Sequence, residues 1–526
     1  MTLSAQVDTA WVRRYDGPGD TVDVGYRAVM DHSGNVYVAG TSVGTSTGKD
    51  FVVLKYDPSG TEQWLRRYDG PAHGLDSVTA MTVDDAGNTY VCGLSTGSGT
   101  SSDYATIKFN PAGDTLWVRR YDGPGNRYDC ATAITVGRSG SIYVTGYSYG
   151  GTSTGTNYAT IKYNQAGDTL WVRRYNPQDN FIDVPTAIAV DSVENVWVTG
   201  RAAEGLTGST FYATVKYNSA GVEQWAREYG QGYDEPTAIA VDGAGNVYVT
   251  GYSYDYSGQG HLLDYLTIKY NTSGLLQWAR RYNGPADGHD GATAIAVGAS
   301  GGIYVTGWSL GNGTNFDFAT MKYTSAGDTL WVRRYSGPGS GPDWGTALVL
   351  DRSDNVYLTG LSVESGGTQD YTTMKYTSTG DTIWRQSYDG TGYGNDIAYS
   401  IAIDDSGYVC VTGASPGTNG DLDFATVRYS QRVTGVVEAL IRGLDHVGFQ
   451  IYPNPARTHF SVRTSRLAGR MSLKIYDVTG KLVSSHVLNP IPNAPCSIAL
   501  HLSAGVYFIK AGVEGRAFVE KLVVTK

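Results

Sequence analysis

The chain has 526 residues, which is too long for one ordinary hydrophobic core and suits one large domain followed by a small one. It holds 69 glycines and 40 tyrosines but only 6 methionines, a composition typical of short strands and tight turns, and no run of eighteen apolar residues that would predict a membrane-spanning helix. Residues 1–430 carry a net charge of −17 and residues 431–526 carry +7, so the acidic first domain excludes nucleic acid as an expected partner.

Eight tryptophans recur along the first domain at intervals of 53 or 54 residues: Trp11, Trp64, Trp117, Trp171, Trp225, Trp278, Trp331 and Trp384. A fixed period indicates one repeated unit whose copies bury their apolar surfaces against one another. The fifth copy contains four strand-like runs, separated by turns rich in Gly, Asn and Asp, at residues 237–241, 247–250, 265–270 and 276–282. Four strands in about fifty residues predict the blade of a β-propeller.

Side-chain volume predicts the order of the strands within a blade. Small residues belong near the crowded axis, so runs such as Ala-Thr-Ala-Ile at residues 131–134 are expected to form the innermost strand. Bulky runs such as Trp-Val-Arg-Arg-Tyr at residues 117–121 are expected to form the outermost strand, where long cationic side chains reach water.

The two ends of the repeat region complement each other. The first outer-type strand, residues 8–15, follows no inner, second or third strand, while the last unit, with strands near residues 397–403, 409–412 and 424–429, has no outer strand after it. We therefore predict an all-β fold in which an eight-bladed propeller over residues 1–430 is closed by the N-terminal outer strand.

Loop lengths indicate which side of the propeller binds a ligand. The turns between first and second strands and between third and fourth strands are short and similar in every copy, and we call their side the hairpin face. The connections between second and third strands and between blades are longer and vary, and we call their side the variable face. Binding is expected on the variable face, because loops on a rigid scaffold usually carry it.

Several polar residues recur in all or most blades. Repetition favours structural roles: backbone capping for the aspartates rather than a ring that binds a cation, and cross-strand contacts and a soluble rim for the basic residues rather than an anion surface. The aspartates before the inner strands are Asp23, Asp76, Asp129, Asp183, Asp234, Asp290, Asp343 and Asp396. Those before the third strands are Asp50, Asp103, Asp264, Asp317, Asp370 and Asp423, and the third-strand bases are Lys55, Lys108, Lys162, Lys216, Lys269, Lys322, Lys375 and Arg428.

Residues that only one blade carries are the better candidates for a ligand site. On the variable face, Tyr252, Tyr254, Tyr256, Trp308 and Trp344 offer aromatic surfaces, and His261 lies in the longest loop. Glu235 and His289 belong to neighbouring blades and are the one acid/base pair that the sequence suggests. No zinc-ligand spacing, phosphate-binding glycine loop or nucleophile motif occurs, so no catalytic residue, metal ligand or cofactor is predicted.

The C-terminal segment carries four motifs in a characteristic order: Ile451-Tyr-Pro-Asn-Pro-Ala, Leu473-Lys-Ile-Tyr-Asp-Val-Thr-Gly-Lys, Leu502-Ser-Ala-Gly-Val-Tyr-Phe-Ile-Lys and Lys521-Leu-Val-Val-Thr-Lys. Residues 449–526 closely resemble the type A C-terminal sorting domain of the type IX secretion system of Bacteroidetes-like bacteria. The short strands and Asn-Pro and Thr-Gly-Lys turns fit a small immunoglobulin-like β-sandwich, joined to the propeller by a linker at residues 431–448. The resemblance implies export through the periplasm by the type IX machinery and usually removal of the domain afterwards.

The propeller units resemble a bacterial β-propeller repeat family, whose core stands here as Gly245-Asn-Val-Tyr-Val-Thr-Gly251. This resemblance implies an extracytoplasmic setting and no particular reaction. We expect a secreted or cell-surface, monomeric, non-catalytic propeller that binds an extracellular glycan, peptide or polymer. The alternatives are a secreted glycan lyase or hydrolase that uses an acid/base pair on the variable face, and a purely structural surface protein.

Overall fold

The computed structural model describes residues 4–151, 155–177, 181–204, 209–255, 262–392 and 394–434, and in the C-terminal part residues 449–452, 459–464, 471–477, 482–488, 496–499, 505–513 and 516–524. The chain divides into two compact units, one formed by Val7–Gln431 and the other by Met1–Gln6 with Arg432–Lys526. Every regular element in the described residues is a β-strand, and these residues contain no helix that could cross a lipid bilayer.

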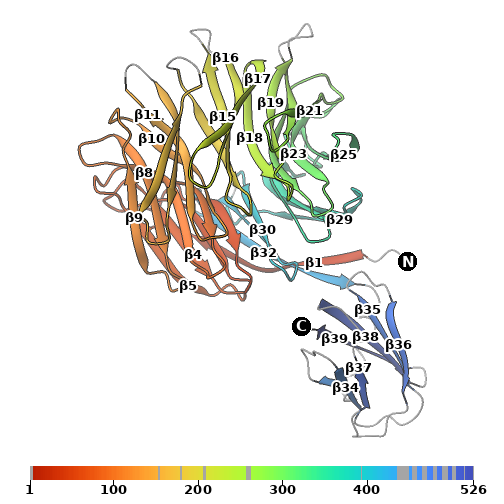
Figure 1. Cartoon of the computed structure of the whole chain (residues 1–526). Coiled ribbons are helices and arrows are strands. Elements are labelled where there is room, and N and C mark those ends of the chain that lie inside the picture. The colour runs from red at the N-terminus through yellow and green to blue at the C-terminus, as the bar shows by residue number, and fades with distance from the viewer. Residues whose placement is uncertain are drawn as a thin grey trace. The chain divides into compact units, whose positions relative to one another are not determined.

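The first unit consists of four-stranded sheets that resemble propeller blades (Figure 1). The first strands of these eight sheets are β2 (Val24–Met30), β6 (Asp76–Val83), β10 (Asp129–Val136), β14 (Val184–Val190), β18 (Asp234–Val241), β22 (Asp290–Val297), β26 (Trp344–Leu350) and β30 (Ile397–Ile403). The second strands are β3 (Val36–Val43), β7 (Thr89–Thr96), β11 (Ile142–Tyr149), β15 (Val196–Glu204), β19 (Val247–Asp255), β23 (Ile303–Leu310), β27 (Val356–Val363) and β31 (Val409–Pro416).

The outer half of each sheet is built from a third and a fourth strand. The third strands are β4 (Lys49–Tyr56), β8 (Ser102–Phe109), β12 (Thr156–Tyr163), β16 (Ser209–Tyr217), β20 (Leu262–Tyr270), β24 (Phe316–Tyr323), β28 (Gln369–Tyr376) and β32 (Leu422–Thr434). The fourth strands are β5 (Glu62–Tyr68), β9 (Thr115–Tyr121), β13 (Thr169–Tyr175), β17 (Glu223–Gly232), β21 (Leu276–Tyr282), β25 (Thr329–Tyr335), β29 (Thr382–Tyr388) and β1 (Ser4–Tyr15).

Burial follows the strand order that side-chain volume predicts. The second strand β27 is buried along its whole length, whereas the first strand β14 and the fourth strand β13 are partly exposed at most positions. Successive first strands contact one another from β2 to β30, and β30 contacts β2. The alanine-rich first strands of neighbouring sheets thus lie side by side, and the tryptophan-containing fourth strands form the opposite edge of each sheet.

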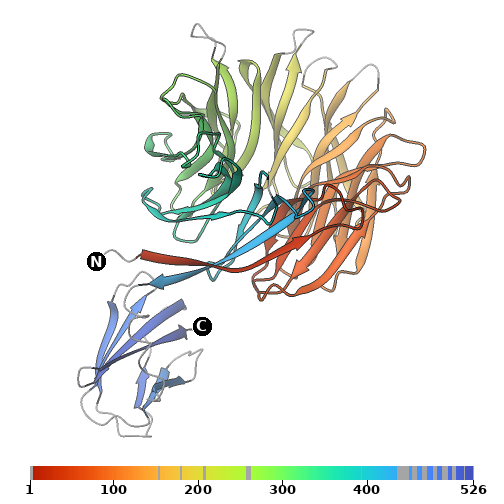
Figure 2. The same cartoon turned by 180° about the vertical axis from the view of Figure 1, so that it is seen from behind.

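The N-terminal strand β1 lies in the sheet of the last three strands of this unit, in the order β1-β32-β31-β30. Both views show β1, in red, running beside β32, in blue (Figures 1 and 2). Arg14 on β1 donates from Nη1 to the Ser415 hydroxyl at 2.6 Å and from Nη2 to the Asp423 carboxylate at 2.8 Å. These charge-assisted bonds fix β1 in the fourth-strand position of that sheet.

The repeated tryptophans connect each sheet to the next one. Trp64 on β5 donates its indole N–H to the Pro111 carbonyl at 3.1 Å, and Trp11 on β1 donates to the Pro58 carbonyl at 3.2 Å. The other six indoles donate in the same way to the carbonyls of Gln165, Ser219, Thr272, Ser325 and Ser378 and to the side chain of Gln431. The period of the sequence is therefore the period of an inter-sheet hydrogen bond.

Six of the turns between first and second strands on the hairpin face are held by an aspartate at their first position. In the turn between β18 and β19, Asp242 accepts from the backbone N–H groups of Ala244 and Asn246, and its second oxygen accepts from the Tyr248 hydroxyl at 3.0 Å. Gly245 takes a φ of +79°, which favours glycine. These requirements explain why Asp, Gly and Asn recur in the turns.

The described C-terminal strands form two sheets. One contains β33 (Phe449–Tyr452), β34 (His459–Thr464) and β37 (Cys496–Ala499), and the other contains β36 (Leu482–Leu488), β35 (Met471–Asp477), β38 (Gly505–Val513) and β39 (Arg516–Val524). On β35, buried Leu473 and Ile475 alternate with exposed Ser472 and Lys474, so this sheet has one apolar face. The two sheets touch where β33 contacts β39.

Candidate ligand-binding site

Arg201, Glu235 and Tyr252 form a polar cluster across two neighbouring sheets on the variable face. Glu235 on β18 and Tyr252 on β19 are cross-strand partners, and the Tyr252 hydroxyl donates to Glu235 Oε2 at 2.7 Å. The other carboxylate oxygen is bonded by Arg201 of the preceding sheet. Burial and the neighbouring Glu235 carboxylate raise the pKa of Tyr252. The side chains of Arg201 and Glu235 are 39% and 32% exposed, and Tyr252 is partly exposed.

Trp308, Phe316 and Trp344 form an aromatic cluster across the two sheets that follow. The ring of Trp308 lies 5.1 Å from that of Phe316 and 6.0 Å from that of Trp344, measured between centroids. Gly291 allows this packing, because a Cβ there would lie 2.5 Å from the Trp308 ring. Trp344 is 40% exposed, so the cluster presents an open aromatic surface. Partly exposed indole rings of this kind suit stacking against an apolar ligand face.

The remaining predicted residues lie apart from these clusters or outside the described residues. Tyr254 packs edge-on against Tyr233, at 5.3 Å between ring centroids. His289 Nδ1 accepts a hydrogen bond from the Leu263 backbone N–H at 3.2 Å. Among the described residues, no ion pair within 4 Å joins Glu235 to His289. Tyr256 and His261 lie outside the described part of the chain.

The eight aspartates before the first strands cap backbone groups at the sheet junctions. Asp23, for example, accepts from the N–H groups of Gly17 and Val43, and Asp343 accepts from those of Gly337 and Val363. The other six accept backbone N–H groups in the same manner. Burial raises the pKa of seven of these carboxyls, those of Asp23, Asp76, Asp129, Asp183, Asp290, Asp343 and Asp396, and most clearly that of Asp183, to about 7. Repetition thus reflects capping rather than a ring built for one ligand.

Among the described residues, four groups of three carboxylates could hold a metal ion. Their members are Asp16, Asp23 and Asp423; Asp50, Asp69 and Asp76; Asp103, Asp122 and Asp129; and Asp370, Asp389 and Asp396. The ligand atoms within each group lie within 4.8 Å of one another, and carboxylate oxygens suit hard cations such as Ca²⁺. In the first three groups an arginine, Arg14, Arg67 or Arg120, already pairs with one carboxylate.

The sequence predicted that the third-strand lysines lie at a soluble rim. The structure places them between neighbouring sheets instead. Lys108 is 5% exposed, and its ammonium lies 5.2 Å from the centre of the Tyr90 ring. It donates to the Gln165 carbonyl at 3.1 Å, which is the acceptor that Trp117 also uses. Each third-strand lysine, and Arg428 in the last sheet, therefore links its sheet to the next one. The third strand is buried on both faces, so a long side chain can place its charged end only at the carbonyl groups of the neighbouring sheet.

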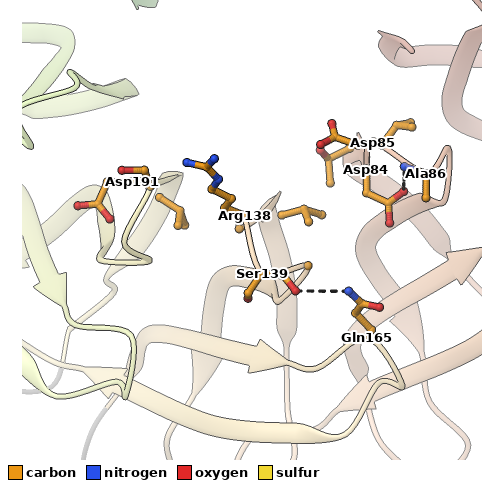
Figure 3. A pocket seen from close by; sticks show the side chains of 14 residues that line it. Asp84, Asp85, Ala86, Arg138, Ser139, Gln165 and Asp191 are labelled. Carbon is orange, nitrogen blue, oxygen red and sulfur yellow. Dashed lines mark hydrogen bonds between the residues drawn. The ribbon is translucent and has the colours of Figure 1, made fainter. Parts of the chain in front are cut away.

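A pocket of about 510 Å³ lies on the hairpin face, where the sequence predicted no binding. It is lined by turns of three successive sheets, including Asp84, Asp85, Arg138, Gln165 and Asp191 (Figure 3). The Gln165 side chain donates to the Ser139 carbonyl at 3.3 Å and closes one wall. The pocket is polar, and the carboxylates of Asp84 and Asp191 are used to hold their own turns. Arg138 is the residue by which the sequence could have indicated this pocket, because the neighbouring copies carry Asp85 and Ser192 at the same turn position.

Sequence reasoning also missed three residues of the first strands, Tyr26, Arg27 and Tyr399. Six copies carry Thr-Ala at the equivalent positions, as at residues 79–80, whereas the copies that meet at β2 and β30 carry Tyr-Arg and Tyr-Ser. This departure from the repeat is visible in the sequence. It lies on the first strands, which the repeat predicts to be uniform and small, so the pattern of the copies points to the loops instead.

Two protein families match separate parts of the chain. Residues 224–257 match the family described as a beta-propeller repeat, and residues 450–525 match the family described as a secretion system C-terminal sorting domain. The first match covers β17 to β19, and the second covers the described strands of the C-terminal unit.

Similarity to individual proteins is distant. An uncharacterized WD repeat-containing protein L264 of Acanthamoeba polyphaga mimivirus is 30% identical over 122 residues, which are 19% of this chain and 8% of that protein. The chain thus spans less than a tenth of that relative's length. The beta-propeller domain of the Trilobed protease from Pyrococcus furiosus is 7% identical, with a TM-score of 0.39 over 71% of this chain and 97% of that one. A protein of unknown function from Dyadobacter fermentans is 9% identical, with a TM-score of 0.37 over 81% of this chain and 99% of that one.

The two family matches agree with the architecture. The four-stranded sheets account for the propeller repeat, and the two small sheets near the C-terminus account for the sorting domain. A sorting domain of this kind directs a protein to the cell surface or to the medium. The chain therefore contains one segment that matches the beta-propeller repeat family, at residues 224–257, and one that matches the secretion system C-terminal sorting domain family, at residues 450–525.

Proposed function

We propose that this protein is a secreted or cell-surface, non-catalytic propeller that binds an extracellular glycan through its variable face. The observation that carries the proposal is the open aromatic cluster of Trp308, Phe316 and Trp344, together with the sorting domain at residues 450–525. Aromatic faces bind the apolar faces of sugar rings, and a rigid β-scaffold holds them in place without loss of side-chain entropy on binding.

We also propose that the eight sheets form an eight-bladed propeller and that the N-terminal strand closes it. The order β1-β32-β31-β30, the contact of β30 with β2 and the bond from Trp11 to Pro58 all support closure. The pairing with β1 also means that β32 is not an edge strand, so its backbone groups are not free to pair with another chain. We place the propeller at residues 1–430, a linker at 431–448 and an immunoglobulin-like sandwich at 449–526, and we propose that the protein is a monomer.

The sandwich is the element that the type IX machinery would recognise, after passage through the periplasm. Its positive charge of +7 over residues 431–526 contrasts with the −17 of the preceding residues, which supports separate roles for the two parts.

The Arg201–Glu235–Tyr252 cluster supplies polar contacts beside the aromatic surface. The polar cluster lies on the sheet of β14 to β17 and the sheet of β18 to β21. The aromatic cluster lies on the next two sheets along the chain, so the two clusters occupy four consecutive sheets. Hydroxyl-rich sugars need donors and acceptors next to a stacking surface, and a guanidinium, a carboxylate and a phenol provide both.

The alternative of a glycan lyase or hydrolase receives less support. Such a reaction needs an acid and a base placed on either side of one bond. Glu235 is held by Arg201 and Tyr252, and His289 is bonded to the Leu263 backbone. The two groups thus bond to different partners, and among the described residues no ion pair within 4 Å joins them.

Glycan-array binding of the full chain tests the proposal, with the Trp344→Ala variant beside it. We expect the loss of one stacking ring to weaken binding by about tenfold or more. Leu330→Ala, which removes a 56% exposed side chain from β25, serves as the control and should bind as the parent does. Equal binding by the Trp344→Ala variant would contradict the site, and preferential capture of peptides would contradict the ligand class.

A further inference from the structure

The first strands share a bulge whose residue ties each sheet to the next. In six sheets this residue is a threonine, and its hydroxyl donates to a carbonyl in the first strand of the following sheet. The bonds run from Thr79 to Ala131, Thr132 to Pro185, Thr186 to Pro236, Thr237 to Ala292, Thr293 to Gly345 and Thr346 to Ala398, at 2.7–3.0 Å. The bond is therefore the standard junction at the axis.

The two junctions that flank β2 depart from this pattern. Their bulge residues are Tyr26 on β2 and Tyr399 on β30, whose rings lie 5.8 Å apart between centroids at an angle of 50°. Both side chains are partly exposed, and burial raises the pKa of both phenols. Two aromatic rings thus stand together where the other sheets have only small side chains.

Arg27 follows Tyr26 and is the one arginine among the equivalent positions. Six sheets carry alanine there, such as Ala80, and β30 carries Ser400. The Arg27 guanidinium donates to the Tyr26 carbonyl at 3.0 Å. Within the described residues, no carboxylate oxygen lies within 4 Å of its nitrogens, and burial lowers the pKa of Arg27.

An arginine in this position can take an anionic partner. Withdrawing a guanidinium from water without a counter-charge costs free energy, and other arginines of the same domain, such as Arg14 and Arg120, are paired with aspartates. Arg27 remains partly exposed, so a partner can reach it from solvent. The constellation also breaks the eightfold repetition, as a binding site for a single ligand must.

The surroundings indicate the class of the anion. The first 430 residues carry −17, which disfavours a polyanion and favours a ligand with one negative group. A guanidinium binds a carboxylate through two parallel hydrogen bonds, and the paired rings of Tyr26 and Tyr399 suit a ligand that carries its carboxylate on a ring.

We propose that Arg27, Tyr26 and Tyr399 form a second binding site, beside the axis, for the carboxylate of an acidic sugar. The Arg27 guanidinium holds the carboxylate, and the two tyrosines pack against the sugar ring. This site is distinct from the variable-face clusters and does not depend on their function.

Calorimetric titration of the full chain with glucuronate tests the site, with glucose and acetate as probes that carry only the ring or only the carboxylate. We expect glucuronate to bind and Arg27→Ala to weaken it by about 10- to 100-fold, because a charge-assisted pair is lost. Arg27→Ala should fold, since six sheets carry alanine at this position, and Tyr399→Thr restores the residue of the common junction. Arg352→Ala, at an 83% exposed arginine on the hairpin face, is the matched control and should leave the affinity unchanged.

Each outcome decides the proposal. Weaker binding in Arg27→Ala and Tyr399→Thr, with glucose unbound and acetate weaker than glucuronate, supports it. Equal affinity in the parent and Arg27→Ala, or no binding of glucuronate, overturns it. Tighter binding of acetate or of glycylglycine than of glucuronate overturns the assignment to a sugar. If Arg27→Ala does not fold, Arg27→Lys replaces it, and unchanged affinity in that variant overturns the requirement for the two-bond guanidinium.

Discussion

Glu194 lies over Gly137 of the preceding sheet and takes the place of the aspartate that other hairpin turns carry themselves. Its carboxylate accepts from the Ser139 backbone N–H at 2.9 Å, from the Tyr143 hydroxyl at 2.9 Å and from the Lys162 ammonium at 3.0 Å. These bonds lower the pKa of Glu194 to about 2, although burial acts in the opposite direction. The same exchange occurs once more, where Asp354 reaches over Gly298 and accepts from the next two backbone N–H groups.

Replacing Glu194 by glycine tests this exchange. We expect Glu194→Gly to lower the free energy of unfolding by about 1–3 kcal/mol, because Lys162 and the turn N–H group lose their acceptor. Relief of the positive φ of Glu194, +64°, reduces the loss but does not cancel it. Chemical denaturation of the full chain measures the difference.

The double variant Gly137→Asp with Glu194→Gly supplies the control. It recreates the turn that six copies carry, and it should recover most of the lost stability. Gly137→Asp alone should be unfavourable, because a Cβ at residue 137 would lie 2.8 Å from Glu194 Oε1. Additive losses in the double variant would show that the two positions are not coupled.

The sequence was sufficient for features that every copy repeats. The Trp11-to-Trp384 period predicted the four-stranded units, and small side chains placed the inner strands correctly, because these patterns follow from packing near an axis. The sequence could not predict features that depend on a contact between two sheets. The burial of Lys108, the reach of Glu194 over Gly137 and the isolation of Arg27 each depend on which neighbour a side chain meets.

Asp370 is an acid that lacks the arginine its counterparts have. In the sheet of β2 to β5, Arg67 pairs with Asp50 at 3.0 Å, and Ser387 stands at the equivalent position beside Asp370. Burial, followed by the nearby carboxylates of Asp389 and Asp396, raises the pKa of Asp370 to about 7. A raised pKa means that ionisation opposes folding, so this group lowers stability as the pH rises from about 4, its unfolded pKa, to 7.

Ser387→Arg should therefore stabilise the protein above pH 7 and flatten this pH dependence. The gain should be on the order of 1 kcal/mol at pH 8 and low salt, because the new guanidinium neutralises a buried carboxylate. Thermal unfolding between pH 4 and 8 measures it. Ser387→Gln, which has no charge, is the control, and an equal gain from that variant would contradict the electrostatic explanation.

Trp171 tests the inter-sheet role of the repeated tryptophans. Its side chain is 8% exposed, donates to the Ser219 carbonyl at 3.2 Å and packs 6.1 Å from the rings of Tyr143 and Tyr217. Trp171→Ala should lower the free energy of unfolding by about 3–5 kcal/mol, because it leaves a cavity and removes one of the two donors to the Ser219 carbonyl, of which Lys162 is the other. Leu170→Ala, at a 53% exposed neighbour, should change stability little, and a similar loss in both variants would contradict the assignment.

Deletion of residues 1–15 tests whether β1 closes the propeller. The deletion removes the partner of β32, the Trp11 bond to Pro58 and the Arg14 contacts to Ser415 and Asp423. We expect a lower unfolding temperature and aggregation through the exposed strand edge, since an unpaired β32 offers free backbone groups to another chain. Deletion of residues 446–526 is the control, because it should leave the propeller folded and abolish export. An unchanged unfolding temperature without residues 1–15 would mean that β1 is an accessory strand, and the argument for closure would lose its main support.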